Sequence, residues 1–412
     1  MSDWKEYKLS DIAEVTTGFP FKGNKYSNNG IRVVRGENVT IGDLRWDTIK
    51  CWNEDFDQLD KYTLRNGDIV IGMDGSRVGK NRAQIRVTDL PLLLAQRVAC
   101  VRAKKGYSQD LIAYLIKSYS FEKYVEMVHT GTSIPHISQK QIEEFKIVIP
   151  RSLPTQIAIA EILSSLDDKI ELNNKINQEL ENLAQTLFNQ WFIDFEFPNE
   201  NGEPYKSSGG EMVDSELGEI PKGWEIGRFS DLVKISTGKG INKKDYLNDG
   251  SYPIIGANGI MGYCANYNIE GFKILTGRVG TLGTVRICNE KAWTSDNVLI
   301  CEPIYVEVNH YSYFVMKDFD YKSLNRGSTQ PLITQTDLKI QSIVSPPKNI
   351  LFPFQSQMDC FLSILESNIL ENNFLTTLRD TLLPKLISGE LEVPSKKHSL
   401  ITDSFKKVGI EL

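Results

Sequence analysis

Apolar residues recur every seven positions through residues 155–192, which is the spacing of a coiled-coil helix. Two such sets interleave there, formed by Ile159, Leu166, Asn173, Leu180 and Leu187, and by Leu163, Ile170, Asn177, Ala184 and Trp191. No Pro or Gly interrupts the chain between Thr155 and Phe197. The pattern predicts one long helix, and about 36 residues in a helix would span roughly 55 Å.

A second seven-residue pattern occupies residues 358–386. Its first set is Met358, Leu365, Asn372, Arg379 and Leu386, and its second is Leu362, Ile369, Thr376 and Leu383. Pro384 predicts a kink or a weakened end of this helix. Asn173 and Asn372 hold equivalent seam positions and would fix the register, because slippage would bury an unpaired amide. In the alternative interpretation these Asn side chains face solvent.

The segments outside the helices alternate short apolar runs with Gly, Asn and Asp turns, which favours an α+β fold. Predicted strands are "GDIVIG" (67–72), "VACVRA" (98–103) and "EFKIVIP" (144–150). Residues 110–128 carry apolar side chains at helical spacing and predict a helix, with 309–319 as its counterpart.

The whole arrangement occurs twice in the chain. "LSDIAEVTTG" (9–18) returns as "FSDLVKISTG" (229–238), 220 positions later. Further along, "GTSIPHIS" (131–138) matches "GSTQPLIT" (327–334) at a shorter offset, as loop-length differences require. A unit of some 200 residues has therefore been used twice.

This repeat predicts six parts and an internal pseudo-twofold relationship. They are a first globular domain (1–153), a long helix (154–197), a connector (198–223), a second globular domain (224–352), a second long helix (353–390) and a tail (391–412). The two helices would pack antiparallel as a spacer between the domains. Such a molecule would measure the separation of two sites on DNA, where half-site spacing follows helical pitch.

Composition fits a cytoplasmic globular protein, with 41% hydrophobic and 24% charged residues and no signal-like start. The six cysteines are scattered and only four histidines are present, so no metal site is expected. The net charge is −6, but the acidity is concentrated in the helices and connector, while the globular domains are mildly positive. That is weak support for DNA binding, since phosphate contacts could come from partner subunits.

Catalytic motifs are lacking. "GSRVGKN" (75–81) has too few residues between its glycines for a phosphate loop, and "SPPK" (345–348) lacks the polar and aromatic residues of an amino-methyltransferase motif. "DLK" (337–339) and "EFK" (144–146) lack an upstream carboxylate that would complete a nuclease site. The chain is therefore expected to be no enzyme by itself.

Several phrases in order carry a resemblance to a known family. They are "WKEYKLSDIAEVTTG" (4–18), "GTSIPHISQKQIEEFKIVIP" (131–150), "PTQIAIAEILSSLDDKIELNN" (154–174), "LFNQWFIDFEFP" (187–198), "GEMVDSELGEIPKGW" (210–224) and "LLPKLISGELEV" (382–393). Together they resemble the specificity (S) subunits of type I restriction–modification enzymes, over nearly the whole chain.

The resemblance implies two tandem α/β target recognition domains separated by two long antiparallel coiled-coil helices. Each domain would read one half of a bipartite, asymmetric double-stranded DNA target, and the helices would set the gap and dock two methyltransferase (modification) subunits. Two restriction subunits can join such complexes. S-adenosylmethionine, ATP and Mg would bind to partner subunits, and this chain would bind no cofactor. The connector would be an ordered bridge.

Polar and basic residues in the Gly-rich loops are the candidates for DNA contact, because base edges are read by such side chains. In the first domain they are Arg35, Asn38, Ser76, Arg77, Lys80, Asn81, Arg82, Thr132, Ser133 and His136. In the second they are Lys239, Asn242, Lys243, Lys244, Asn258, Arg278, Thr281, Arg326, Ser328, Thr329 and Gln330. Arg35, Asn38 and Asn258 could instead be turn-forming scaffold, and Arg77 and Arg278 ordinary surface arginines.

A coiled-coil adaptor with two protein-binding domains and no DNA contact is the alternative function. The repeat and the helices fit it equally well. DNA binding in the presence of methyltransferase partners would separate the two interpretations.

Overall fold

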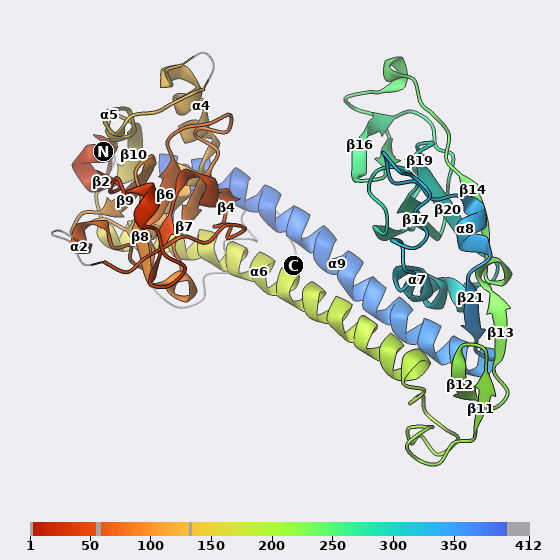
Figure 1. The fold of residues 1–412 in the computed structure, drawn as a ribbon. Coiled ribbons are helices and arrows are strands. Elements are labelled where there is room, and N and C mark those ends of the chain that lie inside the picture. Colours follow the sequence, from red (N-terminus) through yellow and green to blue (C-terminus); the bar gives the residue numbers. More distant parts are fainter. Residues whose placement is uncertain (1–2, 55–58, 132–133, 394–412) are drawn as a thin grey trace. The chain divides into compact units, whose positions relative to one another are not determined.

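The computed structural model describes residues 3–54, 59–131 and 134–393, which fall into two compact units. The first unit comprises residues 1–172 and 371–412, and the second comprises residues 173–370. Each unit contains a β-rich domain and one half of each of two long helices, α6 (Leu153–Phe188) and α9 (Lys348–Ser388) (Figure 1).

The first domain is built on a five-stranded sheet of order β2-β9-β6-β7-β4, antiparallel except between β4 and β7. A three-stranded sheet of order β5-β3-β8 and an antiparallel pair β1-β10 complete it. The strands are β1 (Trp4–Lys8), β2 (Ala13–Thr17), β3 (Ile31–Val34), β4 (Ile41–Gly42), β5 (Cys51–Trp52), β6 (Ile69–Gly72), β7 (Arg82–Gln84), β8 (Leu92–Leu94), β9 (Val98–Ala103) and β10 (Lys146–Pro150). The helices are α1 (Leu9–Ile12), α2 (Leu59–Tyr62), α3 (Gln109–Lys117), α4 (Tyr119–Val128) and α5 (Gln139–Glu143).

The predicted helix over 110–128 is two helices, because Ser118 interrupts it. Ser118 adopts an extended backbone, and its hydroxyl donates to the Leu115 carbonyl and accepts from the Phe121 N–H. A single Ser side chain thus ends α3 and caps α4, as short hydroxyl side chains do when they compete with helical hydrogen bonds. The predicted strands at 67–72, 98–103 and 144–150 are confirmed as β6, β9 and β10.

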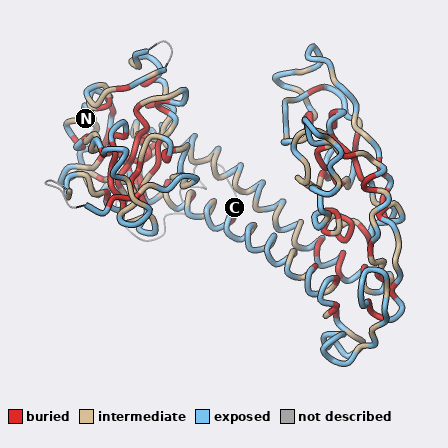
Figure 2. Tube along the Cα trace, viewed as in Figure 1, coloured by how far each residue is buried: buried red, intermediate tan, exposed pale blue. Residues whose placement is uncertain are grey.

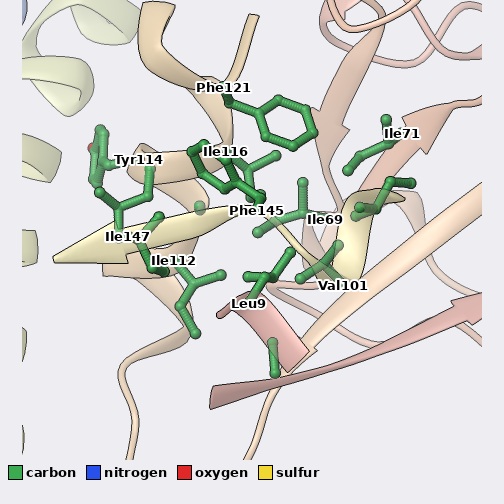
Figure 3. Packing of buried hydrophobic residues seen from close by; sticks show 14 of the residues in the cluster. Leu9, Ile69, Ile71, Val101, Ile112, Tyr114, Ile116, Phe121, Phe145 and Ile147 are labelled. Carbon is green, nitrogen blue, oxygen red and sulfur yellow. The ribbon is translucent and has the colours of Figure 1, made fainter. Parts of the chain in front are cut away.

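Strand β6 is buried on both of its faces. Ile69 and Ile71 pack with α3 and α4 in one hydrophobic cluster, whereas Val70 packs in a second cluster with residues of β3 and β8. Figure 3 shows the first cluster, in which Ile69, Ile71 and Val101 meet Phe121 and Ile116. Because side chains alternate across a strand, burial on both faces requires the continuous apolar run seen in the sequence. The buried residues gather inside this domain (Figure 2).

The second domain has a four-stranded sheet of order β14-β20-β17-β18 and a three-stranded sheet of order β16-β15-β19, with antiparallel pairs β13-β21 and β11-β12. The strands are β11 (Met212–Ser215), β12 (Gly218–Pro221), β13 (Glu225–Arg228), β14 (Val233–Thr237), β15 (Tyr252–Gly256), β16 (Gly259–Cys264), β17 (Lys273–Gly277), β18 (Val285–Cys288), β19 (Trp293–Thr294), β20 (Val298–Pro303) and β21 (Ser342–Ser345). The helices are α7 (Asn309–Lys317) and α8 (Gln335–Lys339). The hairpin β11-β12 lies within the segment that joins the first long helix to this domain.

The two long helices pack together inside each unit. In the first unit, Arg379 pairs with Asp167 at 2.7 Å and Lys169 with Glu371 at 3.1 Å. In the second unit, the Asn368 amide donates to the Asn177 amide oxygen at 2.8 Å. From Asp167 to Lys169 the residue number rises along α6, while the partner on α9 falls from Arg379 to Glu371. The helices therefore run antiparallel in the first unit.

The predicted seam of α6 is buried over residues 159–173, except for the half-buried Ile170, and is half-buried beyond residue 173. The second predicted set on α9 is wrong at Ile369. Ile159, Leu163 and Leu166 are buried and Asn173 is fully buried, which excludes the alternative that Asn173 faces solvent. Ile369, however, is 46% exposed, because Asn368 takes the inward position. Helix α9 continues through Pro384 to Ser388.

Candidate DNA interface

Three loops of the first domain meet at one place and are held by backbone hydrogen bonds. The Met73 N–H donates to the Arg97 carbonyl at 2.9 Å, and the Ile137 N–H donates to the Met73 carbonyl at 2.9 Å. The Gly75 N–H donates to the Pro135 carbonyl at 3.1 Å. The β6-β7 loop, the β8-β9 turn and the segment before α5 are therefore fixed to one another by atoms that any sequence provides.

The β6-β7 loop and the β8-β9 turn, together with Tyr26 and residues 35–37, surround an open hollow of about 470 Å³. Its polar lining is Tyr26, Arg35, Glu37, Asp74, Ser76, Arg77, Asn81, Gln96 and Arg97. Four of the residues predicted from the sequence, Arg35, Ser76, Arg77 and Asn81, are brought together here. Gln96 and Arg97 were missed, although the sequence contains a signal: they are the only polar interruption between two buried apolar runs, 92–95 and 98–101.

Ion pairs hold two guanidinium groups at this hollow. Arg97 Nη1 lies 2.9 Å from Asp74 Oδ2, and Arg35 pairs with Glu37. The Arg35 guanidinium also lies 5.7 Å from the centre of the Tyr26 ring, within cation–π range. Burial raises the pKa of Tyr26 despite the opposing effect of Arg35, so its hydroxyl stays neutral and can donate a hydrogen bond.

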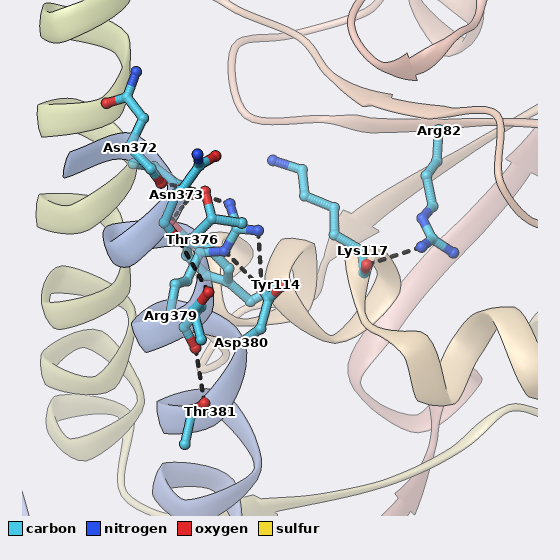
Figure 4. A network of polar contacts seen from close by, with 11 residues as sticks. Arg82, Tyr114, Lys117, Asn372, Asn373, Thr376, Arg379, Asp380 and Thr381 are labelled. Carbon is cyan, nitrogen blue, oxygen red and sulfur yellow. Dashed lines mark hydrogen bonds and ion pairs between the residues drawn. The ribbon is translucent and has the colours of Figure 1, made fainter. Parts of the chain in front are cut away.

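Two predicted residues of the first domain serve the fold. Arg82 is only 8% exposed; its guanidinium donates to the Lys117 carbonyl at 2.8 Å (Figure 4) and lies over the Phe121 ring, and burial lowers its pKa. Asn38 is buried, accepts from the Arg35 N–H at 3.0 Å and donates to the Arg45 carbonyl at 2.9 Å. Asn38 thus has the turn-forming geometry anticipated as an alternative.

The remaining candidates of the first domain border the hollow or lie beside it. Lys80 is half exposed and pairs with Glu122 of α4 at 2.8 Å, and this hydrogen bond raises the pKa of Lys80. His136 is exposed and pairs its backbone with Thr130. Thr132 and Ser133 lie outside the described residues.

The second domain repeats the same backbone hydrogen bonds with different side chains. The Arg278 N–H donates to the Asn297 carbonyl at 2.8 Å, the Ile333 N–H to the Arg278 carbonyl at 3.0 Å and the Gly280 N–H to the Pro331 carbonyl at 2.9 Å. By this correspondence Asn297 takes the place of Arg97. Equivalent loops are therefore held in the same way in both domains, while the side chains they present differ.

Most candidates of the second domain are exposed. Asn258 lies in the β15-β16 turn, beside Ala257, whose Cβ lies near Gly277 before the 278–281 loop. Arg286 was missed by the sequence; its guanidinium lies against the backbone of Gly259. The exposed candidates are Lys239, Asn242, Lys243, Lys244, Asn258, Thr281, Ser328, Thr329 and Gln330, and Arg278 is half-buried.

Arg326 forms an ion pair with Asp337, the buried carboxylate in the first turn of α8. Burial alone would raise the pKa of Asp337. The Thr334 hydroxyl and N–H and the Arg326 guanidinium outweigh that effect, so the pKa lies below its usual value. The Arg326 side chain is nevertheless 60% exposed, which leaves part of it open to a ligand.

Among the described residues, no group of three or more His, Cys, Asp or Glu side chains could hold a metal ion. A search of the same residues for a helix long and apolar enough to cross a bilayer finds none. The fold and the loops define a class of protein with two β-rich domains, each presenting different side chains on one loop scaffold, and two long paired helices.

The comparisons with known proteins identify that class. The model of the type I restriction modification DNA specificity domain matches residues 1–182 and 221–379, and the chain belongs to this family. It is a non-catalytic specificity subunit with DNA-binding target recognition domains.

Relatives of similar length support this assignment. The chain is 26% identical to the type I restriction enzyme MjaIX specificity subunit of Methanocaldococcus jannaschii, with 95% of this chain and 94% of that one covered. It is 27% identical to the HindI specificity subunit of Haemophilus influenzae, with 95% and 100% covered. The solved S subunit of M. genitalium shares the fold, with a TM-score of 0.58, 17% identity, and 93% and 96% of the two chains covered.

Proposed function

We propose that each recognition domain reads one half of a bipartite, asymmetric DNA target, while α6 and α9 set the gap between the halves and dock two methyltransferase subunits. One observation carries the proposal. The same three backbone hydrogen bonds hold equivalent loops in both domains, yet those loops present different polar side chains. An asymmetric target requires two readers of this kind, alike in framework and different in the base edges they contact.

The hollow of the first domain supplies donors of the type that read base edges. Arg35, Ser76, Arg77 and Asn81 line it and remain our candidates for contact with DNA. In the second domain the corresponding candidates lie on the 278–281 loop, the 326–330 loop and the β15-β16 turn. Arg, Asn, Gln, Ser and Thr side chains at these places can contact bases, and lysines such as Lys80 and Lys243 are better suited to phosphates.

The net charge of −6 indicates that this chain does not provide all of the contacts to the DNA phosphates. We place the remainder on methyltransferase subunits, which would also carry S-adenosylmethionine, and on restriction subunits, which would carry ATP and Mg. The complex would act in the cytoplasm. The chain itself would orient the DNA for chemistry performed elsewhere.

Co-expression with the methyltransferase subunits tests the reading function. Arg77→Ala and Lys80→Ala are expected to weaken binding of the assembled complex to target DNA in gel shifts at fixed salt. Wild-type affinity in both variants would remove this loop from the interface. A wild-type complex that assembles but binds no DNA would instead favour the adaptor function.

A length change in the helices tests the spacing function. We expect matched insertion of seven residues into α6 and α9 to preserve the seam and to lengthen the gap in the methylated sequence, with both halves unchanged. The control is the same insertion in α6 alone, which should disrupt helix pairing. An unchanged gap in a correctly assembled double-insertion complex would contradict the spacer role.

A further inference from the structure

The turn between β8 and β9 holds an arginine in an uncommon backbone conformation. Arg97 has φ 67°, in the left-handed region that residues other than Gly rarely adopt. Two backbone hydrogen bonds hold the turn, from the Met73 N–H to the Arg97 carbonyl and from the Gln96 N–H to the Phe19 carbonyl, each 2.9 Å. Such conformations persist where the surroundings determine them, and they collect at binding sites.

An ion pair with one acidic residue, Asp74, orients the side chain of Arg97. It is 71% exposed, and its Nη1 atom lies 2.9 Å from Oδ2 of Asp74, a carboxylate that is 23% exposed. Among the described residues, no second acceptor is recorded for this guanidinium. Since a guanidinium carries five N–H groups, most of its donors stay available to a ligand in the hollow.

The charges around Arg97 favour a base over a phosphate. Glu37 and Asp74 line the hollow together with arginines, and each carboxylate already pairs with one guanidinium, Glu37 with Arg35 and Asp74 with Arg97. This pairing neutralises the charge with which Arg97 would attract a phosphate. The edge of a guanine carries no formal charge and presents two acceptors, O6 and N7, in the geometry that an arginine meets with two parallel hydrogen bonds. Asp74 could in addition accept from a cytosine amino group.

The equivalent position of the second domain differs in chemistry. Asn297 occupies the place of Arg97, and Val279 follows Arg278 where Asp74 follows Met73. Asn297 is exposed, and Val279 stands where the first domain has the acidic Asp74. An amide in such a place suits the edge of an adenine, because it can both donate and accept a hydrogen bond. The two domains therefore carry different readers at one shared place in the scaffold.

We propose that Arg97 is a specificity-determining residue that reads a guanine in the half-site bound by the first recognition domain. The inference rests on the proposed bipartite reading. It predicts that one half of the target contains a guanine whose recognition depends on Arg97 and Asp74 alone. Recognition of the other half should depend on neither residue.

The test is a map of methylated adenines in a host that expresses the full-length chain with its methyltransferase subunits. We expect Arg97→Ala to relax one guanine position, with discrimination against the other bases falling about 5- to 150-fold, as loss of a bidentate contact implies. Arg97→Gly, which also relieves the backbone, should give the same relaxed position. Arg65→Ala, an exposed arginine of the same domain away from the hollow, is the matched control and should leave the motif unchanged.

Each result bears on one of the two proposals. A wild-type map without a bipartite motif would defeat the proposed function. A bipartite wild-type motif that both Arg97 variants leave intact would overturn only the role of Arg97. Equal weakening at every site by both variants, or relaxation at a position other than a guanine, would also overturn it, because it would indicate a phosphate-binding or structural residue.

Discussion

The side chain of Gln156, on α6, accepts a hydrogen bond from the backbone N–H of Ser108 at 2.9 Å. Its amide group also donates to the Pro150 carbonyl at 2.7 Å, and the residue is fully buried. In the second unit, Gln355 on α9 accepts from the His310 N–H at 3.2 Å. One glutamine in each long helix therefore binds a backbone N–H at the start of a domain helix, at the residue before α3 and at the second residue of α7.

Replacing Gln156 by Ala should destabilise the first unit by about 1–3 kcal/mol, because a buried N–H and a buried carbonyl lose their partners. Thermal unfolding of the purified chain measures the effect. The matched control is Gln178→Ala, an exposed glutamine on the same helix, which should change stability little. Equal unfolding temperatures for wild type and the Gln156 variant would contradict a stabilising role for these two hydrogen bonds.

Gly18→Ala should destabilise the first domain, since a Cβ at this position would clash with the carbonyl oxygen of Ala95. The loss expected for such a backbone clash is about 1–3 kcal/mol. Gly238, its counterpart in the second domain, would clash in the same way with Ser295. This close approach is a physical reason why the phrase ending in Thr-Gly occurs in both copies.

Gly23→Ala is the control for that substitution, because nothing lies within 4 Å of a Cβ there. Denaturant unfolding of both variants provides the comparison. A Gly18 variant as stable as the Gly23 variant would show that the turn at residues 95–97 can move aside without loss.

The carboxylate of Asp167 binds two side chains in the first unit, those of Tyr114 and Arg379. It accepts from the Tyr114 hydroxyl at 2.7 Å and pairs with Arg379 at 2.7 Å (Figure 4 shows Tyr114 and Arg379). Asp167→Ala would leave both without this acceptor and should cost about 1–3 kcal/mol, within the range for half-buried groups. Replacing Asp167 and Arg379 together by Leu should recover much of that loss. A double variant less stable than the single variant, measured by urea unfolding, would refute this reasoning.

Asp337 makes the stability of the second unit depend on pH. The pKa of Asp337 in the folded protein lies below the usual value for an Asp side chain, so its contribution to stability is present above that usual value and is lost as the pH falls through the folded pKa. The difference in unfolding free energy between wild type and Asp337→Asn should therefore be largest near neutral pH and shrink below about pH 4. Urea titrations at several pH values measure it. A difference that does not vary with pH would exclude the ionised carboxylate as its source.

The sequence predicted the larger elements well because their signals are long. The heptads of α6 extend over many turns, and the buried strands β6 and β9 are continuous apolar runs. The break at Ser118 was missed because a lone hydroxyl decides it against a strong helical pattern. The exposure of Ile369 was missed because a one-residue shift in a heptad follows from the partner helix, where Asn177 selects Asn368.

The hollow could be predicted only in part. Ser76, Arg77 and Asn81 lie in a Gly-rich loop that local sequence identifies as a candidate for ligand contact, and Arg35 lies in a repeated phrase. Arg97 reaches the hollow through a hydrogen bond from Met73 and an ion pair with Asp74. The polar pair at 96–97 marks a turn in the sequence, but it does not indicate which loop that turn contacts. Arg82 looked equivalent to its neighbours in sequence, yet Phe121 and the Lys117 carbonyl enclose it.

The loops that surround the hollow are fastened by main-chain atoms, so their side chains can be exchanged without loosening the attachment, apart from left-handed positions such as Gly75 and Arg97. Substitutions at these positions can therefore alter which DNA sequence is recognised while leaving folding and assembly intact. Under the proposed function, one substitution in these loops would change both the sequence that the complex methylates and the sequence whose unmethylated form it treats as foreign.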